Sequence, residues 1–362
     1  MTQSSTTRST RAVLSVLALL VGLTAITAVT AFLGGEDMSL TITEALIRLT
    51  VVVGLSIFIG NSGVVSFGHI GFMCIAAYVA AWATCNPMWK QLMLTGLPVF
   101  LQENQYPFLV AVAGGAVLAA LVALVFGAAI MRLSGIAASI ATFAFLAIVN
   151  NIYSNWESVT AGVSSIIGIP TVVDPWIGLA FALVSIVIAF WFKGSRFGLM
   201  LRATRDDPVA AKASGISIVR VRLAAFVLSA FVVGLGGTLY AQFLGVVTVD
   251  MFYLQLTFIT LAMLIIGGMG SVTGAVVGVL AVTVFVEFFR YLEAGVAVGA
   301  STFALPEGSQ EIALGIGMAL ILIFMPAGLT GSKELRLPWP GRSGRDTAGE
   351  QSLARREAAA GS

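Results

Sequence analysis

Charged side chains that could do chemistry gather in one segment of this sequence, residues 193–222. Seven are basic and two are acidic: Lys193, Arg196, Arg202, Arg205, Lys212, Arg220 and Arg222, with Asp206 and Asp207. A basic segment flanked by apolar ones can dock a partner on the cytoplasmic side of a membrane. It can also do no more than fix the orientation of a membrane protein.

The centre of this segment predicts a short, capped helix. Asp207 can accept hydrogen bonds from the first free backbone N–H groups, and Pro208 suits the first helical position. Val209 to Ser214 would form the helix, and Gly215 suits a left-handed residue that ends it. Orientation in a membrane needs only positive charge, so this geometry favours a preformed ridge that fits a groove on a partner.

Catalytic groups are scarce in the rest of the chain. The sequence has a single histidine and no G-x-x-x-x-G-K-[ST] phosphate loop. Glu44 and Glu287 are the main carboxylates inside apolar segments, and Arg48 and Arg290 lie close enough in sequence to pair with them. We therefore expect structural ion pairs rather than a proton relay, and no enzyme activity, cofactor or metal site.

The composition is that of a protein with several membrane spans. Hydrophobic residues make up 58% of the 362 residues and charged residues 10%, whereas a soluble domain has about 25% charged residues. The mean hydropathy is +1.00. Cys74 and Cys85 lie in one apolar stretch, so inert thiols are expected there rather than a disulfide or a metal pair.

The order of apolar segments predicts an all-α, polytopic protein with about ten transmembrane helices and two glycine-rich interruptions. Residues 1–11 would be a cytoplasmic N-terminus, 12–331 the transmembrane domain and 332–362 a disordered cytoplasmic tail. The first apolar run, 12–33, could also be a signal peptide, but it is longer than usual for one. The expected spans are 12–33, 42–60, 72–84, 107–131, 136–152, 176–192, 223–243, 252–266, 275–289 and 312–325.

The basic residues predict the orientation of these spans. With ten spans and a cytoplasmic N-terminus, 16 of the 19 lysines and arginines fall on the cytoplasmic side. Cytoplasmic loops carry an excess of Lys and Arg, and the opposite orientation would reverse the asymmetry. We therefore expect both termini, and the loop 193–222, in the cytoplasm.

Glycine-rich stretches interrupt the apolar pattern twice, at 60–71 and 267–274. Glycine allows helices to pack closely, which is the simpler interpretation. Alternatively, each stretch breaks a helix and exposes backbone groups to a polar path near the membrane midplane. The path residues would then lie near the membrane midplane and face each other: Ser66, Gly68, Gly270, Ser271 and Gly274. His69 could donate to a solute, although a packed, hydrogen-bonded histidine is the simpler expectation.

Several motifs, in order over residues 40 to 331, resemble the inner-membrane permeases of ABC importers for branched-chain amino acids. The basic loop carries Ser195-Arg-Phe-Gly198, Leu201-Arg-Ala203, Arg205-Asp-Asp207, Ala210-Ala211 and Gly215-Ile216. Further matches are Gly54-Leu-Ser56, Ser66-Phe-Gly68-His69, Arg132-Leu133, Ile140-Ala-Thr142, Gly168-Ile-Pro170, Gly267-Gly-Met-Gly-Ser271 and Gly328-Leu329.

This resemblance implies a permease subunit in the inner (plasma) membrane of a bacterium. Its partners would be a second homologous permease, two cytoplasmic ATPase subunits and an external solute-binding protein, and no nucleic acid. The ATPase contact would be formed by Arg205, Asp206, Asp207, Pro208, Ala210, Ala211 and Gly215. The fifth-span motif adds Thr142 to the path residues.

The substrate implied is a branched-chain or related amino acid. The sequence departs from the family pattern at Ala137 and Ala138, where aromatic residues are frequent, and at Ala161, Val163 and Ser164 in an outer loop. Related importers carry urea, amides or aromatic acids, so these solutes are alternatives. A self-sufficient secondary transporter is a rival class, but it would need more intramembrane charge than this chain offers.

Overall fold

The computed structural model describes residues 3–293, 295–298, 301–303, 306, 308–325, 327–331 and 334. Residues Leu20–Glu334 form one compact unit, and the account below concerns that unit. The predicted disordered tail, 332–362, lies outside the described residues except for Glu334, which has defined hydrogen-bond partners.

Helices dominate the described part of the chain. The long ones are α1 (Gln3–Leu33), α2 (Gly35–Ser62), α3 (His69–Thr84), α6 (Phe108–Ile130), α7 (Ile136–Asn155), α9 (Pro175–Gly194), α12 (Ile218–Leu244), α13 (Leu254–Gly267), α14 (Val272–Glu293) and α15 (Ser309–Phe324). The short ones are α4 (Pro87–Met93), α5 (Val99–Glu103), α8 (Glu157–Thr160), α10 (Arg196–Asp206), α11 (Pro208–Ala213) and the 3-10 helix η1 (Asp250–Phe252).

Strands form only two small antiparallel pairs among the described residues. In the first, β1 (Ile166–Ile167) pairs with β2 (Val246–Val247), with Ile166 opposite Val247. In the second, β3 (Val296–Val298) pairs with β4 (Ser301–Phe303), with Val296 opposite Phe303. Both are short connections between helices, so the architecture is all-α.

Each of the ten predicted spans coincides with one long helix, which confirms the class of all-α, polytopic membrane protein. Eight helices in the described part are long and apolar enough to cross a membrane. Helix α3 and α4 meet at an angle of 116° and would add a ninth span if they count as one. The predicted total of ten also includes α15, which has 16 residues, fewer than the usual ~20.

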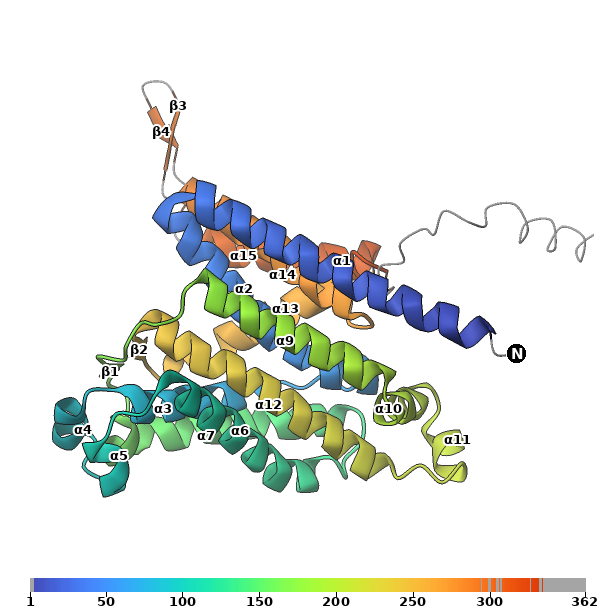
Figure 1. The fold of residues 1–362 in the computed structure, drawn as a ribbon, viewed down its shortest axis with the longest axis horizontal. Helices are drawn as coiled ribbons and strands as arrows, with labels where there is room; N and C mark the ends of the chain where they lie inside the picture. The colour runs from blue at the N-terminus through green and yellow to red at the C-terminus, as the bar shows by residue number, and fades with distance from the viewer. Residues whose placement is uncertain are drawn as a thin grey trace, which may run out of the picture. The chain divides into compact units, whose positions relative to one another are not determined.

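Helix α12 lies between two groups of helices (Figure 1). It packs against α6 and α3 on one side and against α2 on the other, and α2 in turn packs against α9. Residues 49–62 of α2 are all buried. A helix that is apolar on every side belongs in the interior of a bundle, so α2 and α12 form the centre of this unit.

Figure 1 shows small elements at both ends of the long helices. Helices α10 and α11 lie at one end, beside the end of α9 and the start of α12. Helices α4 and α5 and the β1–β2 pair lie at the other end. There Lys90 is buried, and its ammonium donates hydrogen bonds to the carbonyls of Trp82 (3.1 Å) and Asn104 (2.7 Å). The cation is thus satisfied by backbone oxygens.

The charged pairs expected inside spans are present. Arg48 donates to Glu44 at 2.5 Å within α2, and Arg290 lies 2.9 Å from Glu287 within α14. Both predictions of structural ion pairs are confirmed. Cys74 and Cys85 are free and buried, as expected, so the disulfide alternative is wrong.

Glycine lets α13 and α14 pack with their backbones in contact. A Cβ atom added at Gly278 would overlap the Met263 carbonyl oxygen, and one at Gly267 would overlap the Gly274 carbonyl oxygen. Removing side chains at such positions lets backbones approach each other. The close-packing interpretation of the glycines near 267–274 is therefore supported by the contacts of this helix pair.

We expect Gly278→Ala to destabilise the protein, because the added methyl group cannot fit unless a backbone moves. Overpacking of this kind costs typically ~1–3 kcal/mol. Gly315→Ala is the matched control, since a Cβ at Gly315 in α15 would meet nothing within 4 Å. Thermal unfolding of the purified variants in detergent measures both effects. Equal midpoints for the two variants would contradict the packing of α13 on α14.

Candidate functional site

The segment 193–222 folds into two short helices, α10 and α11. Asp207 caps α11: its carboxylate accepts from the N–H groups of Val209 (2.8 Å) and Ala210 (3.0 Å). Gly215 follows the helix with a φ of 82°, a value that favours glycine. The predicted capped helix is therefore confirmed, with Pro208 at its first position.

Helix α10 was not predicted from the sequence. The Ser195 hydroxyl caps it by accepting from the Gly198 N–H at 3.2 Å. It buries one narrow side, with Leu201 and Thr204 fully covered, while its cations lie on the rest of the surface. Ser195 is a common N-cap residue type, so this signal was available in the sequence.

Arginines of α10 hold the C-terminal end of α2. Arg205 donates to the carbonyl of Gly60 at 3.0 Å, and Arg202 donates to the side-chain oxygen of Asn61 at 3.1 Å. The last carbonyls of a helix have no partner inside the helix and carry partial negative charge. Arg205 supplies that partner, and both arginines tie the loop to the central helix α2.

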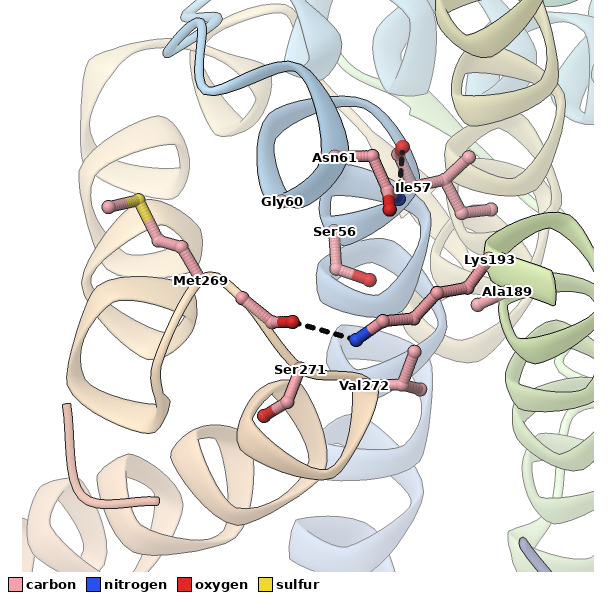
Figure 2. A pocket seen from close by; sticks show the side chains of 10 residues that line it. Ser56, Ile57, Gly60, Asn61, Ala189, Lys193, Met269, Ser271 and Val272 are labelled. Carbon is pink, nitrogen blue, oxygen red and sulfur yellow. Dashed lines mark hydrogen bonds between the residues drawn. The ribbon is translucent and has the colours of Figure 1, made fainter. Parts of the chain in front are cut away.

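Lys193, at the end of α9, reaches the break between α13 and α14. Its ammonium donates to the Gly270 carbonyl at 2.7 Å and lies 2.5 Å from a carboxylate oxygen of Glu334. Figure 2 shows the Lys193 side chain crossing from α9 toward the break, beside Ser56 and Asn61 of α2. One lysine therefore joins the start of the basic loop to the second glycine-rich stretch.

Glu334 completes this contact as the N-terminal cap of α14. Its carboxylate accepts from the N–H groups of Val272 (3.0 Å) and Thr273 (3.2 Å) and from the Thr273 hydroxyl (2.7 Å). Burial alone would raise its pKa, but the Lys193 ammonium and these hydrogen bonds together hold the pKa below the ordinary 4.5. We call Lys193, Gly270 and Glu334 the latch.

The two glycine-rich stretches approach each other beside the latch. A Cβ at Gly60 would overlap the Met269 carbonyl oxygen. The polar space between the two stretches has a volume of about 10 Å³ and is lined in part by Ser56, Asn61 and Ser271. That is room for about one water molecule, so in this conformation no solute of amino-acid size fits between the stretches.

Four of the predicted path residues form one cluster. Ser66 Oγ lies 2.8 Å from His69 Nδ1, and Thr142 Oγ1 accepts from the Phe67 N–H at 3.2 Å. Gly68 lies against the Thr142 carbonyl, where a Cβ would be 2.6 Å from the oxygen. The first break is thus fastened to α7 through Thr142.

His69 is buried at the centre of that cluster. Its Nε2 lies 2.8 Å from the Ser229 hydroxyl of α12, and Phe58, Phe72 and Phe226 surround the ring. With both nitrogens partnered, this is the packed, hydrogen-bonded histidine that the sequence favoured.

The other three predicted path residues form a second cluster. Ser271 Oγ accepts from the Gly274 N–H at 2.8 Å and lies 3.3 Å from the Thr330 hydroxyl, and Gly270 belongs to the latch. Among the described residues, no hydrogen bond joins this cluster to the one around His69. The predicted path residues therefore lie in two groups, one at each break.

Comparison with known families identifies the chain. Residues 38–325 match the family model described as the permease component of branched-chain amino acid transport systems. The chain belongs to this permease family. The match covers nine of the ten predicted spans, both breaks and the basic loop. Glu334 and Thr330, which contact the second break, lie just beyond the matched residues.

Relatives of known function are distant in sequence. The LivM permease proteins of the high-affinity branched-chain amino acid transport systems of Escherichia coli K12 and Salmonella typhimurium are 25% and 26% identical, over 68% of this chain. The chain spans 62% of the length of both proteins. The LivH permease protein of Salmonella typhimurium is 30% identical, over 44% of this chain and 47% of its own length. No solved structure matches the chain significantly.

We expect Asp207→Ala to loosen α11 without unfolding the protein. Loss of an N-cap costs roughly 0.5–2 kcal/mol, and here two backbone N–H groups lose their acceptor. Amide hydrogen exchange should speed up at Val209 and Ala210. Asp206→Ala is the control, because Asp206 makes only an exposed 3.5 Å ion pair with Arg205. Faster exchange in both variants alike would argue against the cap.

Glu334→Gln should make stability less dependent on acid pH. Because the folded-state pKa of Glu334 is lowered, its contribution is fully present above pH 4.5 and is lost as the pH falls through the folded pKa. Thermal unfolding midpoints should therefore be measured between pH 7 and pH 3. The midpoints of wild type and variant should differ less at pH 3 than at pH 7. Glu287→Gln, at an exposed pair, should change the midpoint less. A constant difference at every pH would refute the latch.

Proposed function

We propose that this chain is the permease subunit of an ABC importer for branched-chain or related amino acids. Membership of the permease family and similarity to the LivM and LivH permease proteins of branched-chain amino acid transport support this proposal. The structural observation that carries it is the exposed, capped helix α11, which stands on a loop anchored to two membrane helices. ATP hydrolysis would belong to separate subunits.

The proposed partners are a second homologous permease, two cytoplasmic ATPase subunits and an external solute-binding protein. The basic loop would face the cytoplasm, in a bacterial inner membrane, with both termini on the same side. The ATPase contact would be formed by the residues around α11: Arg205, Asp206, Asp207, Pro208, Ala210, Ala211 and Gly215. Ala211 is buried against the chain itself, whereas Ala210 and Val209 are exposed, so the latter two are the better candidates for direct contact.

The anchoring contacts suggest how movement of α11 would reach the membrane. Arg202 and Arg205 connect the loop to the end of α2, and the latch connects it to the α13–α14 break. A push on α11 would therefore act on both glycine-rich breaks at once. An ATPase can shift the permease between two states only if it contacts them differently, and α11 is where such a contact can be made.

We propose that the solute path forms between this chain and the second permease, and that the two breaks are its moving parts. Ser66, Gly68, His69 and Thr142 would belong to one moving part, and Gly270, Ser271 and Gly274 to the other. The packing of His69 favours a positioning role over contact with the solute.

The test is ATP-driven uptake by the complete importer in proteoliposomes. We expect uptake of leucine, isoleucine or valine that needs ATP, the ATPase and the binding protein. The double variant Ala210→Glu with Gly215→Pro should abolish it, because it places a charge on the exposed face of α11 and removes the left-handed residue after it. Ala203→Glu, at an exposed position of α10, is the matched control and should retain uptake.

Two results would count against the proposal. Uptake that persists without ATP under a proton gradient would indicate a secondary transporter. Normal ATP-driven uptake by a correctly inserted double variant would show that α11 is not the coupling element. Size-exclusion chromatography of the variants separates loss of coupling from loss of folding.

A further inference from the structure

A basic cavity opens beside the α10–α11 loop. Its volume is about 590 Å³, within the range of small-molecule sites. Three parts of the chain form its walls: the first break at 62–64, the turn between α6 and α7 at 131–135, and the loop from Thr204 to Arg222. All three lie at the same end of the long helices, so the cavity opens at one membrane surface.

Four cationic side chains line this cavity: Arg132, Arg205, Lys212 and Arg222. The lining, all of it within the described residues, includes no carboxylate. Asp206 compensates only in part, through an exposed 3.5 Å pair with Arg205. Like charges gathered from separate elements repel one another, and an anion bound among them would remove that cost.

Arg222 is held only weakly by the rest of the chain. Its Nε is buried and has no hydrogen-bond partner among the described residues. Its other recorded contact is a long hydrogen bond of 3.4 Å to the Leu133 carbonyl. An unpartnered buried donor of a charged group is costly. The exposed end of the same guanidinium lines the cavity and can bond a phosphate oxygen, since guanidinium and phosphate match in geometry.

Besides the cations and the hydroxyls of Ser62, Ser134, Thr204 and Ser217, the lining has several apolar side chains, and these distinguish between kinds of anion. Val64, Leu133, Ile216 and Val219 are among the residues that form it. A soluble anion would gain nothing from these side chains, whereas a lipid bears both a phosphate and acyl chains. Basic pockets between membrane helices on the cytoplasmic side suit anionic headgroups. We propose that this cavity binds the headgroup of an anionic phospholipid.

This proposal goes beyond transport and does not depend on which solute is carried. Lys212 is on α11, and Arg205 connects the loop to α2, so a bound headgroup would touch the same loop that the proposed ATPase contacts. The phospholipid would neutralise the cavity and hold the turn at 131–135 against the loop. Binding of the phospholipid can be detected without a transport assay.

The experiment is a lipid titration of the purified full chain, followed by native mass spectrometry. Dioleoyl phosphatidylglycerol should bind more tightly than dioleoyl phosphatidylcholine, and less tightly as salt rises. Arg132→Gln and Arg222→Gln should each weaken phosphatidylglycerol binding about fivefold, and together about 25-fold. Arg220→Gln is the matched control, because Arg220 is exposed on the same helix and does not line the cavity.

Other outcomes would overturn the proposal. Equal binding of the two lipids, or equal weakening by Arg220→Gln and Arg222→Gln, would leave only a general attraction to charge. Displacement of phosphatidylglycerol by millimolar inorganic phosphate would identify a soluble phosphate as the ligand. Variants that still bind lipid but no longer bind the ATPase would show that these cations contact the ATPase instead. If Arg222→Gln fails to fold, lipid binding by Arg132→Gln, at an exposed position, tests the proposal by itself.

Discussion

At two helix breaks, backbone carbonyl oxygens accept hydrogen bonds from cationic side chains of one segment, residues 193–222. The arrangement of the unit depends on these hydrogen bonds. A break in a membrane helix leaves polar backbone groups that neither lipid nor the helix itself can satisfy. Arg205 bonds the Gly60 carbonyl at the end of α2, and Lys193 bonds the Gly270 carbonyl between α13 and α14. Cations of this segment therefore help to stabilise both breaks.

The charge of this loop thus serves more than one purpose. Positive charge retained on one side orients a membrane protein during insertion, and after folding some of the same residues complete helix ends. Arg202, Arg205 and Lys193 have such partners within the chain, while Asp207 and Gly215 shape the exposed α11. The inward contacts fix the loop, and the outward helix is left for a partner.

Local signals account for what the sequence predicted. Capping depends on residues two or three positions apart, as at Asp207, and the ion pair of Glu44 and Arg48 joins neighbours on one helix face. Apolar runs of span length located all ten long helices. These features require no knowledge of how distant segments meet, and the confirmed predictions are of this kind.

Apart from helix α10, whose Ser195 cap is a local signal, the missed features are contacts between distant segments. Glu334 lies in a polar tail whose composition predicts disorder. Its ordered position follows only from its contacts with Lys193 and with the start of α14. Likewise, nothing near His69 points to Ser229, which is 160 positions away. The path residues share a glycine-and-serine pattern, yet the chain places them in two separate clusters, because each break packs against different helices.

Close packing determines how a displacement of the loop would be transmitted to the helices. Where backbones touch, as at Gly278 against Met263 and Gly237 against Met73, there is no soft layer of side chains to absorb a displacement. Tightly packed elements shift as units between discrete arrangements rather than deforming gradually. A movement of α11 would then turn or slide whole helices, and the breaks at 63–68 and 268–271 are where the chain can bend to allow it.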